Sequence, residues 1–341
     1  MSEIVLKLGD KTYSGWKAFE FSKSVEALSS GFYLSSVHTE NLQIGPDTEL
    51  EVFISNNKIL SGYIDTVNFN LQGDQYGIDF QGRDKACDLI DCSAEVKNYI
   101  NIDLNSIVNN VIRPFGFAFE NQTTINPKFK KFDIEPAETV YDVLDKLSSS
   151  SGIFFNTDEN GNIIAQDYGV TQSGGSLILG DNVASIEVNQ DFTDRFSEYK
   201  VVGQSQGDDS LFGVDASSPT GKATDRRIKR YRPLTIQHDE NTTYSIAKKR
   251  AEWEATVRAT RSLNISVSVP LWTISEDSNV LWQVNQIVSL KADQIGLSGN
   301  FLISSLRFSL DESGSKTILD LVRPDAYQPQ PILEQEEIEN L

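Results

Sequence analysis

The fold is indicated by a stretch that occurs twice: Ile64-Asp65-Thr66-Val67-Asn68-Phe69-Asn70-Leu71 and Ile303-Ser304-Ser305-Leu306-Arg307-Phe308-Ser309-Leu310. Each follows a Leu-Ser-Gly tripeptide, and each is followed by a glycine-bearing turn, a second strand-like stretch and an Arg-Asp or Arg-Pro-Asp sequence. Alternating apolar and polar residues around a glycine turn are typical of a β-hairpin. Two hairpins could share this alternation by chance, but the agreement before, within and after the strand favours a duplicated β domain.

Short strand-like segments surround both copies. Residues 3–92 alternate in several stretches separated by turn residues, among them Gly9-Asp10, Asn56-Asn57 and Gly73-Asp74. Similar segments recur at 263–269, 286–290, 301–310 and 317–322. Many short strands at regular spacing suggest a barrel or a sandwich. We therefore expect a mainly β protein with two related β-barrel domains and α+β insertions.

Three segments change to a helical period. Asp103 is placed to cap a helix with Leu104, Ile107, Val108, Val111 and Ile112 on one face, and Pro114 is placed to end it. A second helix is expected from about Pro136 to Ser150, ended by Gly152, before a hairpin over 153–165. A third, over 243–261, has alanines at four-residue spacing, a stripe that allows close packing against another element.

These patterns divide the chain into four parts. We expect a first β-barrel domain at 1–92 and a small α/β domain at 93–169. A second β-barrel domain is expected at 170–325, with a basic helical insertion at about 222–262. Residues 326–341 hold a run rich in glutamate and are expected to be a flexible acidic tail.

Composition limits the possible classes of protein. The 341 residues predict two or three domains, and 49 acidic against 30 basic residues give a net charge of −19. So acidic a chain is a poor general binder of nucleic acid or anionic membranes. No apolar run approaches the length of a membrane span, and the amino terminus predicts a strand rather than a signal peptide. Cys87 and Cys92 are expected to be small, reduced core residues.

Few residues suggest catalysis or metal binding. The only histidines, His38 and His238, lie in polar segments, and no phosphate-binding loop, nucleophile elbow or metal-ligand spacing occurs. The segment 156–162 superficially resembles a calcium loop, but it lacks the closing glutamate, and Gly161 suits a hairpin turn. No catalytic, metal or cofactor residues are predicted.

One segment has the opposite charge to the rest of the chain. Residues 222–232 hold six basic residues and one acid, and 222–261 as a whole has a net charge of +6. A nucleic-acid patch would need a pattern of stacking aromatics, which is absent. We therefore favour a surface for an acidic protein, such as another copy of this chain, over a nucleic-acid patch, and a merely solvated face is an equal alternative. The candidate interface residues are Arg226, Arg227, Lys229, Arg230, Arg232, Trp253, Arg258 and Arg261.

A series of short motifs resembles the baseplate hub family of Mu-like contractile-tailed phages over essentially the whole chain. The motifs are Tyr13-x-Gly15-Trp16, Gly62-Tyr63-Ile64-Asp65, Gly82-Arg83-Asp84-x-x-x-Asp88-Leu89-Ile90-Asp91-Cys92-Ser93, Pro114-Phe115-Gly116, Ser197-x-Tyr199-x-Val201-x-Gly203-Gln204, Arg230-Tyr231-Arg232-Pro233-Leu234, Arg250-Ala251-x-Trp253-Glu254 and Leu281-Trp282. Residues 138–153 are also similar to late-control-D proteins and type VI secretion spikes. Each motif alone is weak, and their order makes the resemblance specific.

The resemblance implies a structural protein of the virion tail, made in the bacterial cytoplasm, and not an enzyme. It implies a homotrimeric ring between the sixfold tail tube and the threefold central spike, among neighbouring baseplate proteins. DNA would pass through its channel without specific binding, and no membrane, cofactor or metal is implied. The motif residues expected to be structural are Gly15, Trp16, Gly62, Asp65, Gly82, Arg83, Asp84 and Asp88.

Two other functions are kept as alternatives. A host-glycan-binding tail module would show exposed aromatic platforms formed by residues such as Trp16, Trp253, Trp272 or Trp282. A peptidoglycan hydrolase would need one carboxyl group with a raised pKa and an ionised partner.

Overall fold

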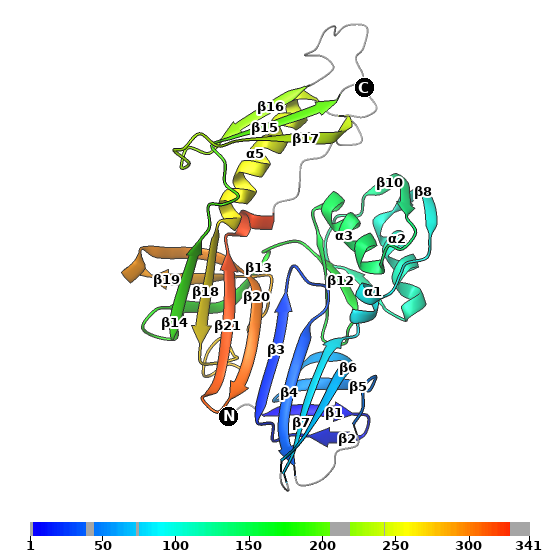
Figure 1. The fold of residues 1–341 in the computed structure, drawn as a ribbon, viewed down its shortest axis with the longest axis vertical. Helices are drawn as coiled ribbons and strands as arrows, with labels where there is room; N and C mark the ends of the chain where they lie inside the picture. The colour runs from blue at the N-terminus through cyan, green and yellow to red at the C-terminus, as the bar shows by residue number, and fades with distance from the viewer. Residues whose placement is uncertain (1–2, 39–43, 73–74, 205–218, 242, 328–341) are drawn as a thin grey trace. The chain divides into compact units, whose positions relative to one another are not determined.

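The computed structural model describes residues 3–38, 44–72, 75–204, 219–241 and 243–327. It divides into two compact units (Figure 1). Unit 1 comprises residues 1–186 and 266–321, and unit 2 comprises residues 187–265 and 322–341.

A 13-stranded sheet is the main element of the fold. Its strands are β1 (Ile4–Leu8), β2 (Lys11–Tyr13), β3 (Ala18–Ser24), β4 (Gly31–His38), β5 (Glu49–Ile54), β6 (Asn57–Gln72), β7 (Gln75–Asp84), β13 (Thr171–Ile178), β14 (Ser185–Gln190), β18 (Leu263–Val269), β19 (Gln286–Ala292), β20 (Leu297–Asp311) and β21 (Gly314–Val322). Eleven of them follow the order β14-β18-β21-β20-β3-β4-β7-β6-β5-β1-β2, and β19 joins β13 to β20.

The two copies of the repeated pattern lie on β6 and β20. Each is the first strand of an antiparallel hairpin, β6–β7 and β20–β21 (Figure 1). The two β regions meet where β20 pairs with β3, which places Phe308 opposite Phe21 with ring centroids 5.9 Å apart. The mainly β class is confirmed. The described strands form an open sheet and close no barrel within one chain, so the two barrels stay a prediction.

An α/β part follows β7 within unit 1. It contains α1 (Cys87–Asp91), β8 (Lys97–Asp103), α2 (Leu104–Ile112), η1 (Arg113–Phe115), β9 (Phe119–Asn121), β10 (Lys128–Ile134), α3 (Val140–Ser151), β11 (Phe154–Thr157) and β12 (Ile163–Gln166). Strand β10 pairs with β8, and β11, β12 and β9 form a three-stranded sheet. The apolar faces of α2 and α3 share one core with these strands.

The sequence predicts α2 correctly and places the start of α3 too early. Asp103 caps α2 by accepting a hydrogen bond from the Ser106 amide at 3.0 Å. Helix α3 begins at Val140 rather than Pro136, because Thr139 and Asp142 form a reciprocal capping box at that point. Gly152 ends the helix in the left-handed conformation, as expected.

Unit 2 is built on one long helix. Its elements include β15 (Glu198–Gln204), β16 (Thr220–Thr224), β17 (Pro233–Asn241), α5 (Tyr244–Arg261) and η3 (Pro324–Tyr327), and the strand order is β16-β15-β17. The small-residue stripe lies where expected, because Ala247 and Ala251 are buried against this sheet. A Cβ on Gly221 would lie 2.1 Å from the Ala247 carbonyl carbon, so β16 and α5 touch through their backbones.

The remaining predictions on chain organisation concern domain boundaries and termini. The domain limits at 92, 169 and 325 stay predictions; the basic segment 222–262 lies in unit 2, which begins at Glu187. Of the expected acidic tail, Ala326 and Tyr327 belong to η3, and the rest lies outside the described residues. None of the described helices is long and apolar enough to cross a membrane.

Candidate functional sites

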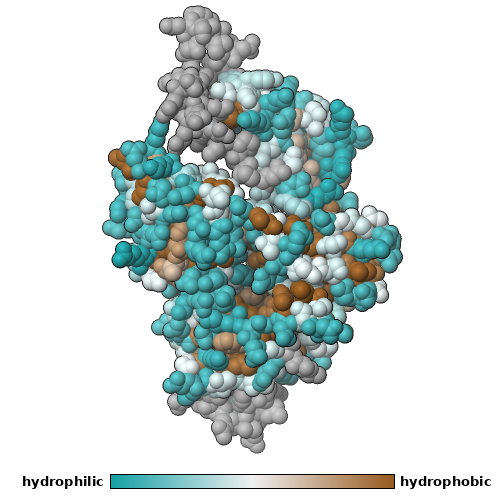
Figure 2. All heavy atoms as spheres, turned by 180° about the vertical axis from the view of Figure 1, so that it is seen from behind, coloured by the Kyte–Doolittle hydropathy of each residue, from teal (hydrophilic) through white to brown (hydrophobic). Residues whose placement is uncertain are grey.

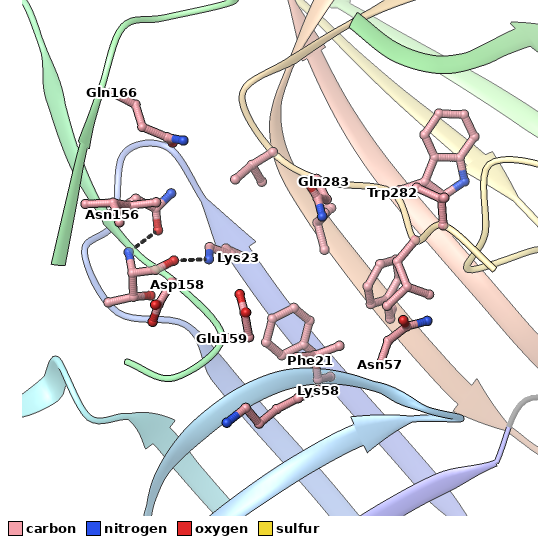
Figure 3. A pocket seen from close by; sticks show the side chains of 18 of the residues that line it. Phe21, Lys23, Asn57, Lys58, Asn156, Asp158, Glu159, Gln166, Trp282 and Gln283 are labelled. Atoms are coloured by element: carbon pink, nitrogen blue, oxygen red, sulfur yellow. Dashed lines mark hydrogen bonds between the residues drawn. The ribbon is translucent and has the colours of Figure 1, made fainter. Parts of the chain in front are cut away.

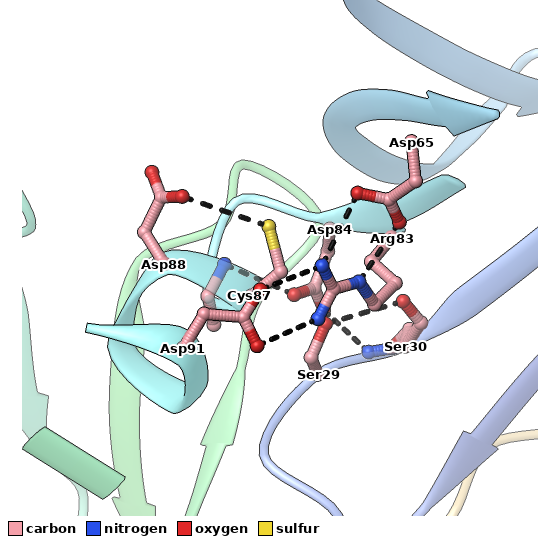
Figure 4. Close-up of polar contacts among 9 residues, drawn as sticks. Ser29, Ser30, Asp65, Arg83, Asp84, Cys87, Asp88 and Asp91 are labelled. Carbon is pink, nitrogen blue, oxygen red and sulfur yellow. Dashed lines mark hydrogen bonds and ion pairs between the residues drawn. The ribbon is translucent and has the colours of Figure 1, made fainter. Parts of the chain in front are cut away.

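The motif residues at the end of β7 form an ion-pair network (Figure 4). The Arg83 guanidinium lies between two carboxylates, with its Nε 2.8 Å from Asp65 Oδ2 and its Nη2 2.8 Å from Asp91 Oδ2. These hydrogen bonds raise the pKa of Arg83 and lower the pKa of Asp91. Asp65 marks a register shift between β6 and β7, so the network fixes this irregularity against α1.

Asp84 links the sheet to the α/β part. Its buried carboxylate accepts hydrogen bonds from the Ser30 amide (2.8 Å), the Ala86 amide (3.1 Å) and the Thr157 hydroxyl (2.9 Å). Every one of these partners belongs to the protein itself. The structural role expected for Arg83, Asp84 and Asp65 stays a prediction, and these intramolecular contacts are the kind that such a role requires.

The motif glycines allow two backbones to approach closely. A Cβ on Gly62 would lie 2.0 Å from the Arg83 carbonyl oxygen, and a Cβ on Gly82 would lie 2.1 Å from the Tyr63 carbonyl oxygen. Gly15 has φ +81°, a conformation that favours glycine, and precedes Trp16, which packs edge-on against Phe80. The bend of β6 over β7 thus needs glycine on both strands.

The two cysteines differ in their surroundings. Cys87 is buried in α1, and burial together with the nearby Asp88 carboxylate raises the pKa of its thiol to about 12. Cys92 is exposed just after the helix, so the expectation that both are core residues is wrong for Cys92. A five-residue helix with its apolar side turned inward buries Cys87 and Leu89 and leaves its carboxyl end in solvent. Both thiols are free.

A cavity of about 840 Å³ opens within unit 1 between β3, β20, the β11–β12 hairpin and residues 279–284 (Figure 3). Its wall contains aromatic rings, many carboxamides and the amine of Lys23, which donates a hydrogen bond to the Thr157 carbonyl oxygen at 2.6 Å. Burial lowers the pKa of Lys23, opposed by the carboxylates of Asp84, Asp158 and Glu159.

Asp158, one of the acids at this cavity, lacks the raised pKa that a general acid needs. Asp158 accepts hydrogen bonds from the amides of Asn160 (2.9 Å) and Asn162 (2.7 Å). Burial acts to raise the pKa of Asp158, but these hydrogen bonds outweigh it and hold the pKa below its usual range. A general acid needs a raised pKa. The segment 156–162 comprises the end of β11 and the turn of the β11–β12 hairpin, with Gly161 at φ +85°, which confirms the predicted turn.

An apolar face at the end of β6–β7 is left exposed by the residues that the structure describes. The surface in Figure 2 is mostly hydrophilic, with hydrophobic side chains in separate groups. On the hairpin, Phe69 is 60% exposed, Leu71 67% and Tyr76 41%. Phe69 pairs with Ile78 and Leu71 with Tyr76, so the three lie on the face that buries Ile78 further along.

The candidate interface residues of unit 2 fall into two groups. Arg226, Arg227, Lys229 and Arg230 are exposed on the loop between β16 and β17. The other four contact their own unit. Arg232 donates to the carbonyl oxygens of Phe192 (3.2 Å) and Thr193 (2.8 Å), Trp253 is half-buried beneath the Arg250 guanidinium, Arg258 pairs with Glu254 at 2.8 Å, and Arg261 lies over the Tyr327 ring.

The remaining predictions concern the two histidines and the four tryptophans. The side chains of His38 and His238 lie outside the described part of the structure. Trp16, Trp272 and Trp282 are buried and Trp253 is half-buried, so none of the four tryptophans is an exposed platform.

The sequence analysis does not identify three features of the structure. The buried pair of Arg195 and Asp225 was not singled out; its signal is the one acid within the basic run 222–232. Glu254, buried between Arg250 and Arg258 on α5, could have been found from its four-residue spacing to both. The exposure of Phe69 and Leu71 cannot be predicted from the sequence, because the alternation of apolar and polar residues on β6 is the same as on β20, where the corresponding Phe308 is buried.

Comparison with known proteins now identifies the family. Residues 3–84 match the N-terminal domain described as "Mu phage baseplate assembly protein GpP-like", 86–167 match the second domain of "Baseplate hub protein gp44-like", and 243–330 match the fourth domain of "Mu phage baseplate assembly protein GpP". The 43 kDa tail protein of prophage MuSo2 from Shewanella oneidensis is 30% identical, with a TM-score of 0.85 over 96% of this chain and 99% of that one. The chain belongs to the Mu-like phage baseplate hub family.

Other relatives agree with this membership. Baseplate hub protein gp44 of Escherichia phage Mu is 28% identical over 95% of this chain and 88% of its own length. A tail protein of Neisseria meningitidis MC58 shares the fold at 21% identity, with a TM-score of 0.82 over 96% and 98% of the two chains. A type VI secretion component of E. coli shares the fold at 13% identity, with a TM-score of 0.58 over 96% of this chain and 79% of that one. The relatives in this family are structural tail proteins and not enzymes.

Proposed function

We propose that this hub protein forms a homotrimeric ring that joins the sixfold tail tube to the threefold central spike and encloses the channel through which DNA leaves. The ring would lie in the tail baseplate of the virion after synthesis in the host cytoplasm. Each chain has two related hairpins, β6–β7 and β20–β21, on one sheet. Three chains would therefore offer six similar surfaces to the tube.

The observation that carries the proposal is the open sheet. Strand β6 pairs with β5 only as far as Tyr63, and among the described strands its residues 65–72 pair only with β7. At the far end of the strand order, β14 pairs with β18 and with no other described strand. Unpaired strand edges invite another chain to pair with them. Copies joined edge to edge would close a ring, and the predicted barrels would be completed between chains.

The uncovered apolar face supports the same arrangement. Phe69, Leu71 and Tyr76 lie together at the end of the hairpin whose outer edge is free. A soluble monomer gains nothing from exposing three large apolar side chains on one hairpin, whereas an interface buries them.

Molar mass in solution tests the proposal. Light scattering is measured on the purified chain alone and mixed with the central spike protein of the same particle. A trimer, or a monomer that becomes a trimer with the spike, is the expected result. A stable monomer that ignores the spike would overturn the proposal and make binding to host glycans the next assay.

A further inference from the structure

The loop between β16 and β17 is held at both ends by hydrogen bonds and carries several exposed basic side chains. Ser197 holds both of its ends: its carbonyl oxygen accepts from the Asp225 amide at 3.2 Å, and its hydroxyl accepts from the Arg232 amide at 2.8 Å. The Arg232 carbonyl oxygen in turn accepts from the Ser197 amide at 2.8 Å. The loop therefore begins and ends on the same residue of β15's amino-terminal flank.

A buried ion pair fixes the first turn of this loop. Arg195, 2% exposed, donates from its Nε to Asp225 Oδ2 at 2.9 Å, and its guanidinium lies over the Phe192 ring. The other carboxylate oxygen of Asp225 accepts from the Arg227 amide at 3.0 Å. Asp225 is the only acid of residues 222–232. Its carboxylate is thus paired inside the unit and neutralises none of the outward charges.

The outward side chains have no partner within the described residues. Residues 226–232 hold five basic residues and no acid. Arg226, Arg227, Lys229 and Arg230 are exposed and form no ion pair with any residue that the structure describes, and Tyr231 between them is 86% exposed. Arg195, Arg232, Arg250 and Arg258 of the same unit all have partners. These four cations repel one another, and no ion pair with a described residue offsets that repulsion, so their grouping does not stabilise the isolated chain.

We infer that this loop, residues 226–231, binds the acidic surface of unit 1 in a neighbouring copy of the chain. Unit 1 has 16 basic and 32 acidic residues, a net charge of −16, so each copy supplies the complementary charge. Copies of net charge −19 repel at long range, and a local contact of opposite charge offsets that repulsion and fixes register. Arginine and tyrosine are the residues enriched at protein interfaces. The inference rests on the proposed assembly of copies.

A nucleic acid is the competing partner for a cluster of arginines with an exposed tyrosine. The loop presents one aromatic ring, whereas single-stranded nucleic acid is bound by successive aromatic stacking platforms. The net charge of the whole chain also opposes the approach of a polyanion. These two facts favour the protein partner.

Zero-length crosslinking tests the contact directly. Full-length chains labelled with 14N and 15N are mixed with the spike present, and a carbodiimide joins lysine amines to carboxylates in contact with them. Lys229 is the only lysine of the loop, so its crosslinks report on this site. We expect heavy-to-light crosslinks from Lys229 to acids within 1–186 or 266–321.

The outcomes separate this inference from the proposed function. Trimers without such crosslinks would overturn the inference and leave the proposed ring intact. Chains that stay monomeric with spike present would overturn both. Binding of a labelled DNA oligonucleotide that needs Arg226, Arg227 and Arg230 would replace the protein partner by nucleic acid.

Charge reversal provides the matched variants. R226E/R227E/R230E is expected to weaken association of the subunits about 100-fold at low salt while the chain still folds, because opposite charge becomes like charge at the contact. K222E/K248E/K249E makes the same change of net charge on exposed lysines of the same unit. It also removes the exposed Lys222–Glu198 pair, which contributes no more than about 1 kcal/mol to folding, and it should leave association within a factor of about three. Equal effects of the two variants, or normal particle yield with the first, would contradict the inference.

Discussion

Phe69 and Phe308 occupy the same position of the repeated pattern, yet Phe69 is 60% exposed and Phe308 is 1% exposed. Phe308 is covered by Phe21, and Trp272 lies with its ring centroid 6.4 Å away. The residue opposite Phe69 is Ile78, and no comparable aromatic residue covers Phe69 among the described residues. One copy of the hairpin thus has its cover within the chain, and the other presents the same face to solvent.

This difference predicts that F69D/L71D prevents assembly without unfolding the chain. Both side chains are exposed in the monomer, so the substitution costs little stability there, whereas charges buried in an interface without partners cost several kcal/mol, about a 100-fold or greater loss of association. Light scattering of the variant with spike should give the mass of one chain.

The control for this variant lies on the same strand. Asn68 and Asn70 are exposed and alternate with Phe69 and Leu71, so N68D/N70D adds the same charge to the opposite face. That control should assemble normally. If both variants assemble alike, the apolar face is not an interface.

The sequence predicts local structure well because caps and turns are local. Asp103, Gly152 and Gly161 each lie where their chemistry requires, and the helix over 243–261 is found within one residue of its start. Thr139 shows the limit, since Pro136 also suits a helix start and only the capping box decides between them.

Strand partners are less predictable because alternation defines the two faces of a strand and not its neighbour. Pairing of β3 with β20 joins residues such as Phe21 and Phe308 that are far apart in the chain, and nothing local indicates it. The same limit explains why Arg226 and Arg232, both basic residues of one run, were predicted alike although only Arg232 contacts its own unit.

Replacing Gly82 by alanine should destabilise unit 1. The added Cβ would lie 2.1 Å from the Tyr63 carbonyl oxygen and 2.6 Å from the Phe32 ring, and a backbone atom paired in the sheet cannot move aside. We expect the free energy of unfolding to fall by about 3 kcal/mol.

Chemical denaturation measures the effect of G82A, with G45A as the control. A Cβ on Gly45 would meet no atom within 4 Å, so this change should stay within about 0.5 kcal/mol. A G82A chain as stable as G45A would show that β6 and β7 can separate at the bend.

The two thiols should differ in reactivity. Burial raises the pKa of Cys87 to about 12, and the thiolate is the reactive form, so iodoacetamide at pH 8 should label exposed Cys92 at least about 100-fold faster. Mass spectrometry of the digested protein assigns the label. Equal labelling of both cysteines in the folded chain would show that α1 opens readily.

The same pKa shift predicts how the free energy of unfolding changes with pH. An unfolded thiol ionises near pH 8.5, whereas that of Cys87 ionises near pH 12 in the folded chain. The contribution of the buried thiol is therefore fully present below about pH 8.5 and is lost as the pH rises through 12. C87A should show a shallower loss of stability than the parent chain above pH 8.5.

The buried pair of Arg195 and Asp225 should behave non-additively on mutation. D225A leaves a guanidinium that is 2% exposed without its carboxylate, and we expect it to destabilise unit 2 by about 3–5 kcal/mol. R195M/D225A removes both charges and should cost much less than D225A alone, because no buried charge stays unpaired. Hydrogen exchange of α5, read by mass spectrometry, measures the stability of unit 2 separately from unit 1.

An exposed ion pair of the same unit is the control for these two variants. Lys222 and Glu198 lie 3.5 Å apart with 59% and 38% of their side chains exposed, so E198A should cost no more than about 1 kcal/mol. If D225A is as mild as E198A, the buried pair does not hold the basic loop in place. The other outcome is that D225A strongly destabilises unit 2 and R195M/D225A restores the protection of α5 against hydrogen exchange. Apolar side chains can then replace the stability of the ion pair, and the specific role of the pair is to fix the position of the loop. The assembly of R195M/D225A then separates the contribution of the outward charges from that of the loop's position. This variant retains every outward cation, but the first turn of its loop has lost the ion pair.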